Sequence, residues 1–512
     1  MAQQPEVEVE AIPLTADGAQ SIVRICSGDR ERMEKHLFQR YPHREWGSFF
    51  RFGWRRTPWG VAIFYVDGLW PEPGDLDRQT GMTTFREQYS RRAFRAACDA
   101  QGLGIGVIHS HPAGYGTWPS PLDDDMDGYF GREFGSFTCR APYCSLIFQR
   151  SDEKGFTFSG RVYDRGQWLP VAELITVGPK IDRDQSEILN VSSNDYIIES
   201  EATAERLASL MGSASLRRLE SAVVGVIGCS GTGSPTIEVL ARARVGEFVL
   251  VDPEKLSPSN LERVHGSRFS HVQGPGYPFK VDLMREMILD INPSARVTTF
   301  AGNILHENVI DELIRCNLLL GCVDSQHARV AESDFAQHFI LPSIDVGVRM
   351  AGTAGKVTEQ VVDFNVFSPE HPCAYCGGRV NSAELAIELM TDEERISRQH
   401  DAEQAAARGD DPDQYWRQQT RQLHTVGYLT TAAGALAAGY AEGWLTGTFS
   451  IPHSTFQFDP SKTRFACVAP PRDRIEACIC NRLIGWGDAA RSYRNVSLPS
   501  HWSKKAMLRA KR

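Results

Sequence analysis

Short apolar runs alternate with amphipathic stretches along most of the chain, and this alternation predicts an α/β protein. Residues 222–227 and 248–251 are apolar and rich in β-branched residues, as in strands that are buried on both faces. Between them a glycine-rich turn leads into a helix that begins near residues 232–235, where Pro235 suits a first helical turn. The second half of the chain is therefore expected to be built around a strand–turn–helix–strand unit.

The same patterns occur elsewhere in the chain. Strands are expected near residues 45–50, at 59–66, at 104–108 and within 139–162, and helices at 29–39, 85–100, 197–211 and 424–448. A polar stretch at 182–195 is typical of a linker, and the basic C-terminal end is typical of a solvated tail. The expected order is an N-terminal domain (1–175), a linker with one helix (176–215), a second domain (216–485) and a basic tail (486–512).

Composition narrows the class of protein. With 512 residues and 42% apolar content, the chain is long enough for two or three domains with sizeable cores. The net charge of -9 gives no electrostatic reason to expect nucleic-acid binding. Neither a signal peptide nor a membrane-spanning run is evident, so we expect a cytoplasmic protein without a membrane partner. The 12 cysteines are then expected to be thiols, metal ligands or catalytic groups before disulfides.

The turn after residue 227 carries Gly228, Gly231 and Gly233 in the spacing G-x-x-G-x-G. Such a turn presents backbone N–H groups and a helix N-terminus to a phosphate. Asp252 ends the next strand, where an acidic residue can bond a ribose hydroxyl. Glycines also end strands for steric reasons alone, but the strand and helix on either side favour nucleotide binding here.

The residues that follow carry a family signature. The stretch from 252 to 263, D-P-E-K-L-S-P-S-N-L-E-R, resembles the signature of the ThiF family and of ubiquitin-activating enzymes. A lysine at 280 and the stretches at 321–324 and 344–347 follow in the order of that family. The resemblance covers roughly residues 216–485. It implies a Rossmann-like adenylation domain with a mainly parallel sheet, which uses ATP and Mg²⁺.

The resemblance also implies roles for five side chains. Adenylation joins a carboxylate to the α-phosphate of ATP and expels pyrophosphate, so charge develops on phosphoryl oxygens and cations must be held there. By resemblance, Arg263 and Lys280 contact the phosphates, and Asn260 helps to position them. Asp252 would hold the ribose and Asp324 would hold Mg²⁺. Taken singly each would be an ordinary surface residue, but their order favours adenylation.

A second set of chemical groups lies in the N-terminal domain. His109 and His111 follow the strand expected at 104–108, and residues two apart in a strand point to the same side. A carboxylate from Asp123 can close a His₂Asp site, and three such ligands with an open position are typical of catalytic zinc. A further carboxylate is then needed as general base, and Glu45 is the candidate. Two polar histidines at a strand end are the ordinary alternative.

This constellation resembles the JAMM (MPN⁺/JAB) metalloprotease motif, in which an upstream Glu precedes H-x-H-P and S-x-x-D. The resemblance implies an N-terminal JAMM-type α/β domain that cuts peptide or isopeptide bonds after the C-terminus of ubiquitin-like proteins. It makes the two histidines and Asp123 zinc ligands, Glu45 the general base, and Ser120 a group that stabilises the oxyanion. Eight residues separate the second histidine from Ser120, one more than is common, which leaves Asp124 and Asp125 as alternatives to Asp123.

Four cysteines form two close pairs. Cys373 and Cys376 are spaced C-x-x-C, and Cys478 and Cys480 are spaced C-x-C. Together they would make a tetrahedral S₄ zinc site, which resembles the structural zinc of bacterial ThiF-type enzymes. Cys467 is an alternative ligand, and a redox-active pair is an alternative function.

One absence bears on the reaction. Enzymes of this kind that form a thioester carry a nucleophilic cysteine in a crossover segment, and the corresponding residues 377–423 contain no cysteine. We therefore expect the reaction to end at the acyl-adenylate, unless another residue forms the covalent intermediate.

Taken together, these features predict a bifunctional enzyme of a bacterial-type ubiquitin-like pathway, with a zinc (iso)peptidase head and an adenylating head. Its expected partner is a ubiquitin-like or sulfur-carrier protein with a C-terminal glycine. A conjugating enzyme is a further candidate partner, and a homodimer is expected by family analogy. Two alternatives remain: a sulfur-carrier adenylyltransferase of the thiamine, molybdopterin or cysteine type with a carrier-processing protease, and a non-catalytic scaffold for ubiquitin-like proteins.

Overall fold

The computed structural model describes residues 18–79, 83–100, 102–137, 141–152, 155–187, 201–274, 276–353, 355–412, 425–451, 454–460, 464–466, 474–490 and 507–510. These residues form two compact units, which are described separately. The first unit comprises residues 18–177, 182–187 and 484–490, and the second comprises 178–181, 201–483 and 507–510. None of the described helices has the length and apolar character needed to cross a bilayer.

An eight-stranded sheet in the order β1-β3-β2-β6-β7-β8-β9-β10 forms the first unit, and β1 also pairs with β9. This extra pairing closes the sheet on itself. The strands are β1 (Ser21–Cys26), β2 (Trp46–Thr57), β3 (Gly60–Leu69), β6 (Gly104–Ser110), β7 (Tyr143–Ser151), β8 (Gly155–Asp164), β9 (Gln167–Val177) and β10 (Ile181–Gln185). The other elements are α1 (Ser27–Leu37), α2 (Glu87–Asp99), α3 (Pro121–Phe137) and a hairpin of β4 (Leu76–Gln79) and β5 (Thr83–Phe85).

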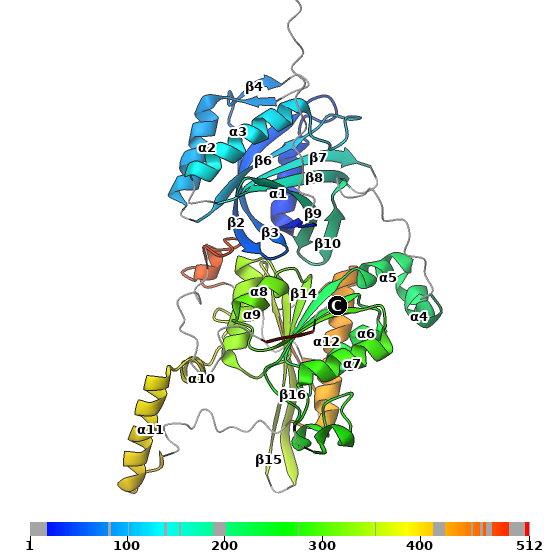
Figure 1. Cartoon of the computed structure of the whole chain (residues 1–512), viewed down its shortest axis with the longest axis vertical. Helices are drawn as coiled ribbons and strands as arrows, with labels where there is room; N and C mark the ends of the chain where they lie inside the picture. The colour runs from blue at the N-terminus through cyan, green and yellow to red at the C-terminus, as the bar shows by residue number, and fades with distance from the viewer. Residues whose placement is uncertain are drawn as a thin grey trace, which may run out of the picture. The chain divides into compact units, whose positions relative to one another are not determined.

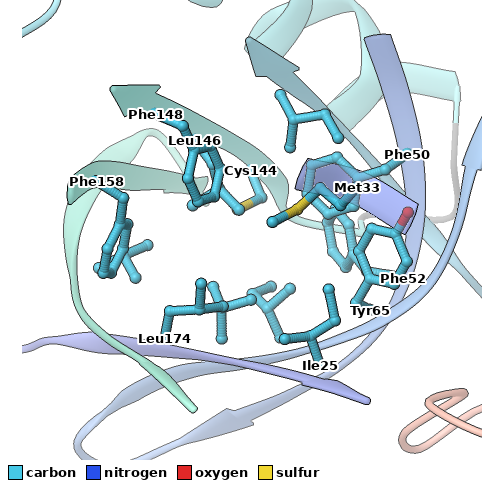
Figure 2. Packing of buried hydrophobic residues seen from close by; sticks show 14 of the residues in the cluster. Ile25, Met33, Phe50, Phe52, Tyr65, Cys144, Leu146, Phe148, Phe158 and Leu174 are labelled. Carbon is cyan, nitrogen blue, oxygen red and sulfur yellow. The ribbon is translucent and has the colours of Figure 1, made fainter. Parts of the chain in front are cut away.

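Strand β2 separates two apolar cores because successive side chains point to opposite faces. Phe50 and Phe52 are fully buried with β-strand residues such as Leu146 and Leu174, and Figure 2 shows these side chains converging between the strands. Phe49 points the other way and joins the core beneath α2 and α3. Burying an aromatic side chain stabilises the fold by about 1.5–3 kcal/mol. The alternation along β2 therefore stabilises both cores.

A nine-stranded sheet in the order β18-β17-β16-β15-β14-β11-β12-β13-β19 forms the second unit. The strands from β15 to β13 in that order run parallel, and the flanking strands are antiparallel. The bounds are β11 (Val223–Ile227), β12 (Glu247–Val251), β13 (Arg296–Ala301), β14 (Leu318–Gly321), β15 (Ser343–Thr353), β16 (Lys356–Phe367), β17 (Thr455–Asp459), β18 (Arg464–Ala466) and β19 (Met507–Ala510).

Helices cover both faces of this second sheet. In Figure 1, α8 and α9 lie on one side of the strands, and α6, α7 and α12 lie on the other. The helices are α4 (Glu201–Met211), α5 (Ser213–Glu220), α6 (Gly233–Arg242), α7 (Lys280–Ile291), α8 (Glu307–Leu313), α9 (Gln326–His338), α10 (Ser382–Glu388), α11 (Asp392–Ala407) and α12 (Gly427–Thr446). The α/β class and the β11–α6–β12 unit predicted from the sequence are confirmed.

The predicted linker, residues 176–215, starts before the strands of the first unit have ended. Strand β9 runs past residue 175, and β10 follows where the polar stretch predicts a linker. Asp184 in β10 pairs with Arg30 at 2.8 Å, and Arg183 pairs with Glu173 at 2.7 Å. Apart from the buried Ile181, this strand consists of polar residues that include these ion-pairing side chains, so its sequence lacks a strand pattern.

The prediction of a solvated tail is wrong for two described stretches. Residues 484–490 belong to the first unit, where the Gly53 N–H donates to the Gly485 carbonyl at 3.0 Å and Arg55 pairs with Asp488 at 3.1 Å. A Cβ on Gly53 would lie 2.2 Å from that carbonyl oxygen, which explains a glycine inside a strand. Strand β19 pairs with β13 in the second sheet.

Candidate active sites

The glycine-rich turn of the second unit lies between β11 and α6. Gly228 adopts φ +90, which favours glycine, and its N–H donates to the Val251 carbonyl at 2.8 Å. A Cβ on Gly233 would lie 1.9 Å from the Gly228 oxygen. Any side chain at position 233 would therefore force the turn open.

Asp252 ties this turn to the end of β12. Its two carboxylate oxygens accept hydrogen bonds from the backbone N–H groups of Cys229 and Glu254, each at 2.8 Å. Burial raises the pKa of the Asp252 carboxyl, although the nearby Lys280 ammonium and these two N–H donors oppose that rise. The carboxylate is thus held rigidly beside the turn, as a ribose-binding acid must be.

Two cations approach the same turn. The methylene groups of Arg263 lie against Gly231, since a Cβ on that glycine would be 3.0 Å from the arginine Cδ. The ammonium of Lys280 is buried and pairs with the exposed carboxylate of Glu254. Asn260 shapes the segment before Arg263: its Oδ1 accepts the Ser257 N–H at 3.1 Å, and its carbonyl accepts the Arg263 N–H at 3.0 Å.

Asp324 lies on the loop after β14, which is the parallel neighbour of β11. The preceding Val323 packs on Gly228, where an added Cβ would be 2.7 Å from the valine side chain. Asp324 itself is exposed. The carboxyl ends of β11, β12 and β14 therefore bring the predicted residues to one edge of the sheet, the usual place for a ligand in such folds.

No role was predicted for Glu254, which is the second acidic residue of the signature stretch and lies two residues after Asp252. The structure places its carboxylate on Lys280, the predicted phosphate ligand. That position in the family signature was the signal that would have identified it.

In the first unit, the predicted zinc ligands converge. The Nε2 atoms of His109 and His111 are 3.3 Å apart, and each lies within 3.2–3.5 Å of a carboxylate oxygen of Asp123. All three side chains are buried. Ligands about 2.0–2.1 Å from a tetrahedral zinc would lie about 3.3 Å apart, so these residues fit the ion.

Hydrogen bonds orient these groups for a cation. The Nδ1–H of His111 donates to the Gly116 carbonyl at 2.9 Å, which turns its Nε2 lone pair toward the other two side chains. Burial alone would raise the pKa of Asp123, but His109, His111 and Ser120 together hold it far below its ordinary range. Burial would lower the pKa of His109, yet the Asp123 charge raises it.

The loop length left three aspartates as candidates, and the structure separates them. Asp124 and Asp127 both pair with the buried Arg161, at 2.5 and 2.6 Å, and Asp125 is exposed. Asp123 alone of the three candidates joins the two histidines.

Glu45, Ser120, His109 and Asp123 line a cavity of about 200 Å³. The Ser120 hydroxyl donates to the Asp123 carboxylate at 2.7 Å, and the charge of Glu45 acts on His109. The remainder of the wall is mostly apolar and is formed by Gly47, Thr84, Phe85, Leu122, Met126 and Phe130. The Glu45 carboxylate, which could accept a proton, and an apolar wall, which could contact an apolar group of a ligand, therefore line the same cavity.

The four cysteines of the second unit also converge. Their Sγ atoms lie within 4.8 Å of one another, with Cys373–Cys478 and Cys376–Cys480 contacts of 3.7 Å. Sulfurs about 2.3 Å from a tetrahedral zinc would lie about 3.75 Å apart, so the donor set fits a structural ion. Cys467 lies outside the described residues.

A parallel α/β sheet with a glycine-rich turn, a strand-end carboxylate and two cations at one edge defines a nucleotide-binding domain. Comparison with known families makes this specific: the family model "ThiF family" matches residues 203–480. The chain belongs to the ThiF family. The match lies within the second unit, so the metalloprotease interpretation of the first unit stays a prediction.

Similar curated proteins include the adenylyltransferase and sulfurtransferase UBA4 of Saccharomyces cerevisiae (strain RM11-1a). It is 29% identical over 161 residues, which are 31% of this chain and 34% of that protein. The Candida glabrata UBA4 is 28% identical over 158 residues, which are 31% of this chain and 35% of that protein. The aligned region is thus about a third of each relative. A solved structure of E. coli MccB with ATP has a TM-score of 0.41 at 16% identity, covering 54% of this chain and 74% of that one.

Proposed function

We propose that the second unit uses ATP to adenylate the C-terminal glycine of a sulfur-carrier or ubiquitin-like protein. The observation that carries this proposal is the meeting of Asp252, Arg263 and Lys280 at the glycine-rich turn. Membership of the ThiF family and the similarity to enzymes named adenylyltransferase and sulfurtransferase support it.

The protein groups have separate tasks in this reaction. The backbone N–H groups of the turn and the start of α6 receive phosphate oxygens, while Arg263 and Lys280 offset the charge that develops on them. The Lys280 ammonium forms an ion pair with the Glu254 carboxylate in the structure. Phosphate oxygens must therefore compete with that carboxylate for the ammonium. Asp324 would hold Mg²⁺, which would offset the negative charge of the phosphates.

Among carriers, we favour a sulfur carrier over a modifier that is conjugated to other proteins. Residues 377–423 contain no cysteine, so the segment lacks the nucleophile for a thioester. The relatives with sulfurtransferase in their names point the same way. A homodimer and a conjugating enzyme remain expectations from family analogy, and the four-cysteine cluster is proposed to hold a structural zinc.

A second candidate function belongs to the first unit, because its buried His109, His111 and Asp123 have the spacing of zinc ligands. We propose that this unit is a metallopeptidase that processes or removes the carrier. A bound zinc would supply Lewis-acid chemistry. Glu45 would take a proton from the attacking water, and Ser120 would donate to the oxyanion.

The test of the main proposal is ATP–pyrophosphate exchange with candidate carrier proteins that end in Gly-Gly. We expect Asp324→Ala and Arg263→Ala to lower exchange by roughly a hundredfold, as losing one charge-stabilising group commonly does. Asp290→Ala, an exposed carboxylate on α7, is the matched control and should exchange like the wild type. Equal exchange by Asp324→Ala and this control would reject the assigned site.

A parallel arm tests the protease. Carriers with extra residues after Gly-Gly should exchange only after cleavage, so Glu45→Ala should use the mature carrier but not the extended one. If the extended carrier is never cleaved by the zinc-loaded wild type, and conjugates are not cleaved either, the metallopeptidase proposal fails while the adenylation proposal is unaffected.

A further inference from the structure

The helix α10 follows the turn that carries Cys373 and Cys376, and it packs beside α9 (Figure 1). Helix α9 begins two residues after Asp324. Its own N-cap residue, Ser325, makes no side-chain cap hydrogen bond. The first N–H groups of α9 must therefore find acceptors elsewhere, because no helix can satisfy its own first turn.

Glu388, the last residue of α10, supplies those acceptors. One of its carboxylate oxygens accepts the Gln326 N–H at 2.9 Å, and the other accepts the His327 N–H at 2.8 Å. The second oxygen also accepts the Nδ1–H of His327 at 2.7 Å. Burial would raise the pKa of Glu388, but these donors lower it below its ordinary value. The Glu388 carboxylate thus accepts three hydrogen bonds from the start of α9.

Neighbouring hydrogen bonds determine which nitrogen of His327 donates to Glu388. Asn303 accepts the Leu305 N–H on Oδ1 and so presents its Nδ2–H₂ to the Nε2 of His327, at 2.8 Å. His327 is consequently the neutral tautomer that donates from Nδ1 to Glu388. On the other side, the Gln326 side chain donates to Glu384 at 3.0 Å and accepts the Asn381 N–H at 3.0 Å.

We propose that Glu388 is a positioning residue of the nucleotide site, which holds the Asp324 loop in place through the first turn of α9. This rests on the proposed adenylation function. The loop joins β14, beside the glycine-rich turn, to the N–H groups that Glu388 holds. Val323 of the same loop packs on Gly228, so the loop lies against the glycine-rich turn, and a shift of the α9 terminus would displace the candidate Mg²⁺ ligand Asp324.

The geometry also links α10 to the proposed nucleotide site through the first turn of α9. Glu388 makes three of the contacts that hold the segment after the cysteine cluster to the start of α9, and Glu384 and Asn381 add contacts to Gln326. Displacement of α10 would therefore release the Asp324 loop. Glu388→Ala removes all three acceptor contacts. Glu388→Gln retains one carbonyl oxygen but turns an NH₂ group toward N–H donors, so it should behave nearly as badly.

The experiment compares full-length wild type, Glu388→Ala, Glu388→Gln and the control Glu393→Gln, an exposed acid at the start of α11. Calorimetry measures the binding of ATP with Mg²⁺ and of ATP with a chelator. Hydrogen exchange follows the peptides that contain residues 322–330. We expect both Glu388 variants to bind Mg·ATP about tenfold or more weakly, to bind chelated ATP nearly unchanged, and to exchange faster at 322–330 only.

Each outcome decides a separate point. If the Glu388 variants match Glu393→Gln in both Mg·ATP affinity and exchange, the inference is overturned. If affinity falls equally with and without Mg²⁺, Glu388 supports the fold rather than the Asp324 loop, and the inference is also overturned. If the wild type binds no Mg·ATP, the adenylation proposal fails, and the exchange data alone then show whether Glu388 holds the loop.

Discussion

Replacing Arg161 with methionine should destabilise the first unit and weaken zinc binding at its candidate metal site. Arg161 is 4% exposed and donates to Asp124 at 2.5 Å and to Asp127 at 2.8 Å. Methionine fills most of the space but leaves both carboxylates buried without their cation. Removing one partner of a buried ion pair costs about 3–5 kcal/mol, because the remaining charge is uncompensated.

The loss should depend on pH with a definite sign. Burial raises the pKa of Asp127 even with Arg161 present, and the substitution removes the charge that opposes that rise. An acid whose pKa is higher in the fold than in the unfolded chain costs nothing below its unfolded pKa and destabilises the fold as pH rises through the folded value. The destabilisation by Arg161→Met should therefore be smaller at pH 5 than at pH 8.

Hydrogen exchange of the α3 and β7 peptides measures this free energy in the intact chain. Arg91→Met is the matched control, because Arg91 pairs with Glu87 while both are 76% exposed, and such pairs contribute less than about 1 kcal/mol. Since Asp124 and Asp127 lie one and four residues after the candidate ligand Asp123 on α3, zinc affinity should also fall by about 10–100-fold. Equal exchange in the two variants, or unchanged zinc affinity, would refute the reasoning.

Three further predictions concern the second unit. Cys480→Ser should cost the protein one zinc in metal analysis and lower its melting temperature, because a structural ion contributes folding energy. Gly233→Ala should abolish ATP binding, since its Cβ would lie 1.9 Å from the Gly228 oxygen, whereas Gly439→Ala, with nothing within 4 Å, should bind normally. Burial raises the pKa of Glu332 from 4.5 to about 8, so wild-type stability should decline between those pH values and that of Glu332→Gln should not; parallel melting curves across this range would contradict it.

The parts of the fold that the sequence predicted share a physical cause. Strands β11 and β12 are buried on both faces, so their sequences are continuously apolar, and the turn between β11 and α6 accepts only glycine at positions 228 and 233. His109, His111 and Asp123 were predictable because strand alternation and a short loop bring them together locally. Local spacing sufficed wherever a few neighbouring residues determine the geometry.

Structural features that depend on residues far apart in the sequence could not be predicted from local sequence patterns. The pairing of β1 with β9 closes the first sheet across about 150 residues of chain, and neither strand signals its partner. Strand β19 is an edge strand in which Arg509 pairs with Asp282 at 2.9 Å, so it reads as a basic tail. Glu388 looks like an ordinary charge on a helix until α9 is placed against it.

The cysteines of the second unit bear on what happens after adenylation. Cys229 and Cys322 lie nearest the nucleotide turn, but both are buried, and burial raises the pKa of each thiol well above its ordinary value. A thiol must ionise and reach its target to act as a nucleophile, so neither is suited to form a thioester. The Sγ atoms of the four clustered cysteines face one another, and a zinc bound there would leave them unavailable as nucleophiles. Of the described thiols of this unit, Cys229 and Cys322 are therefore poorly suited to accept the activated carrier in the proposed reaction.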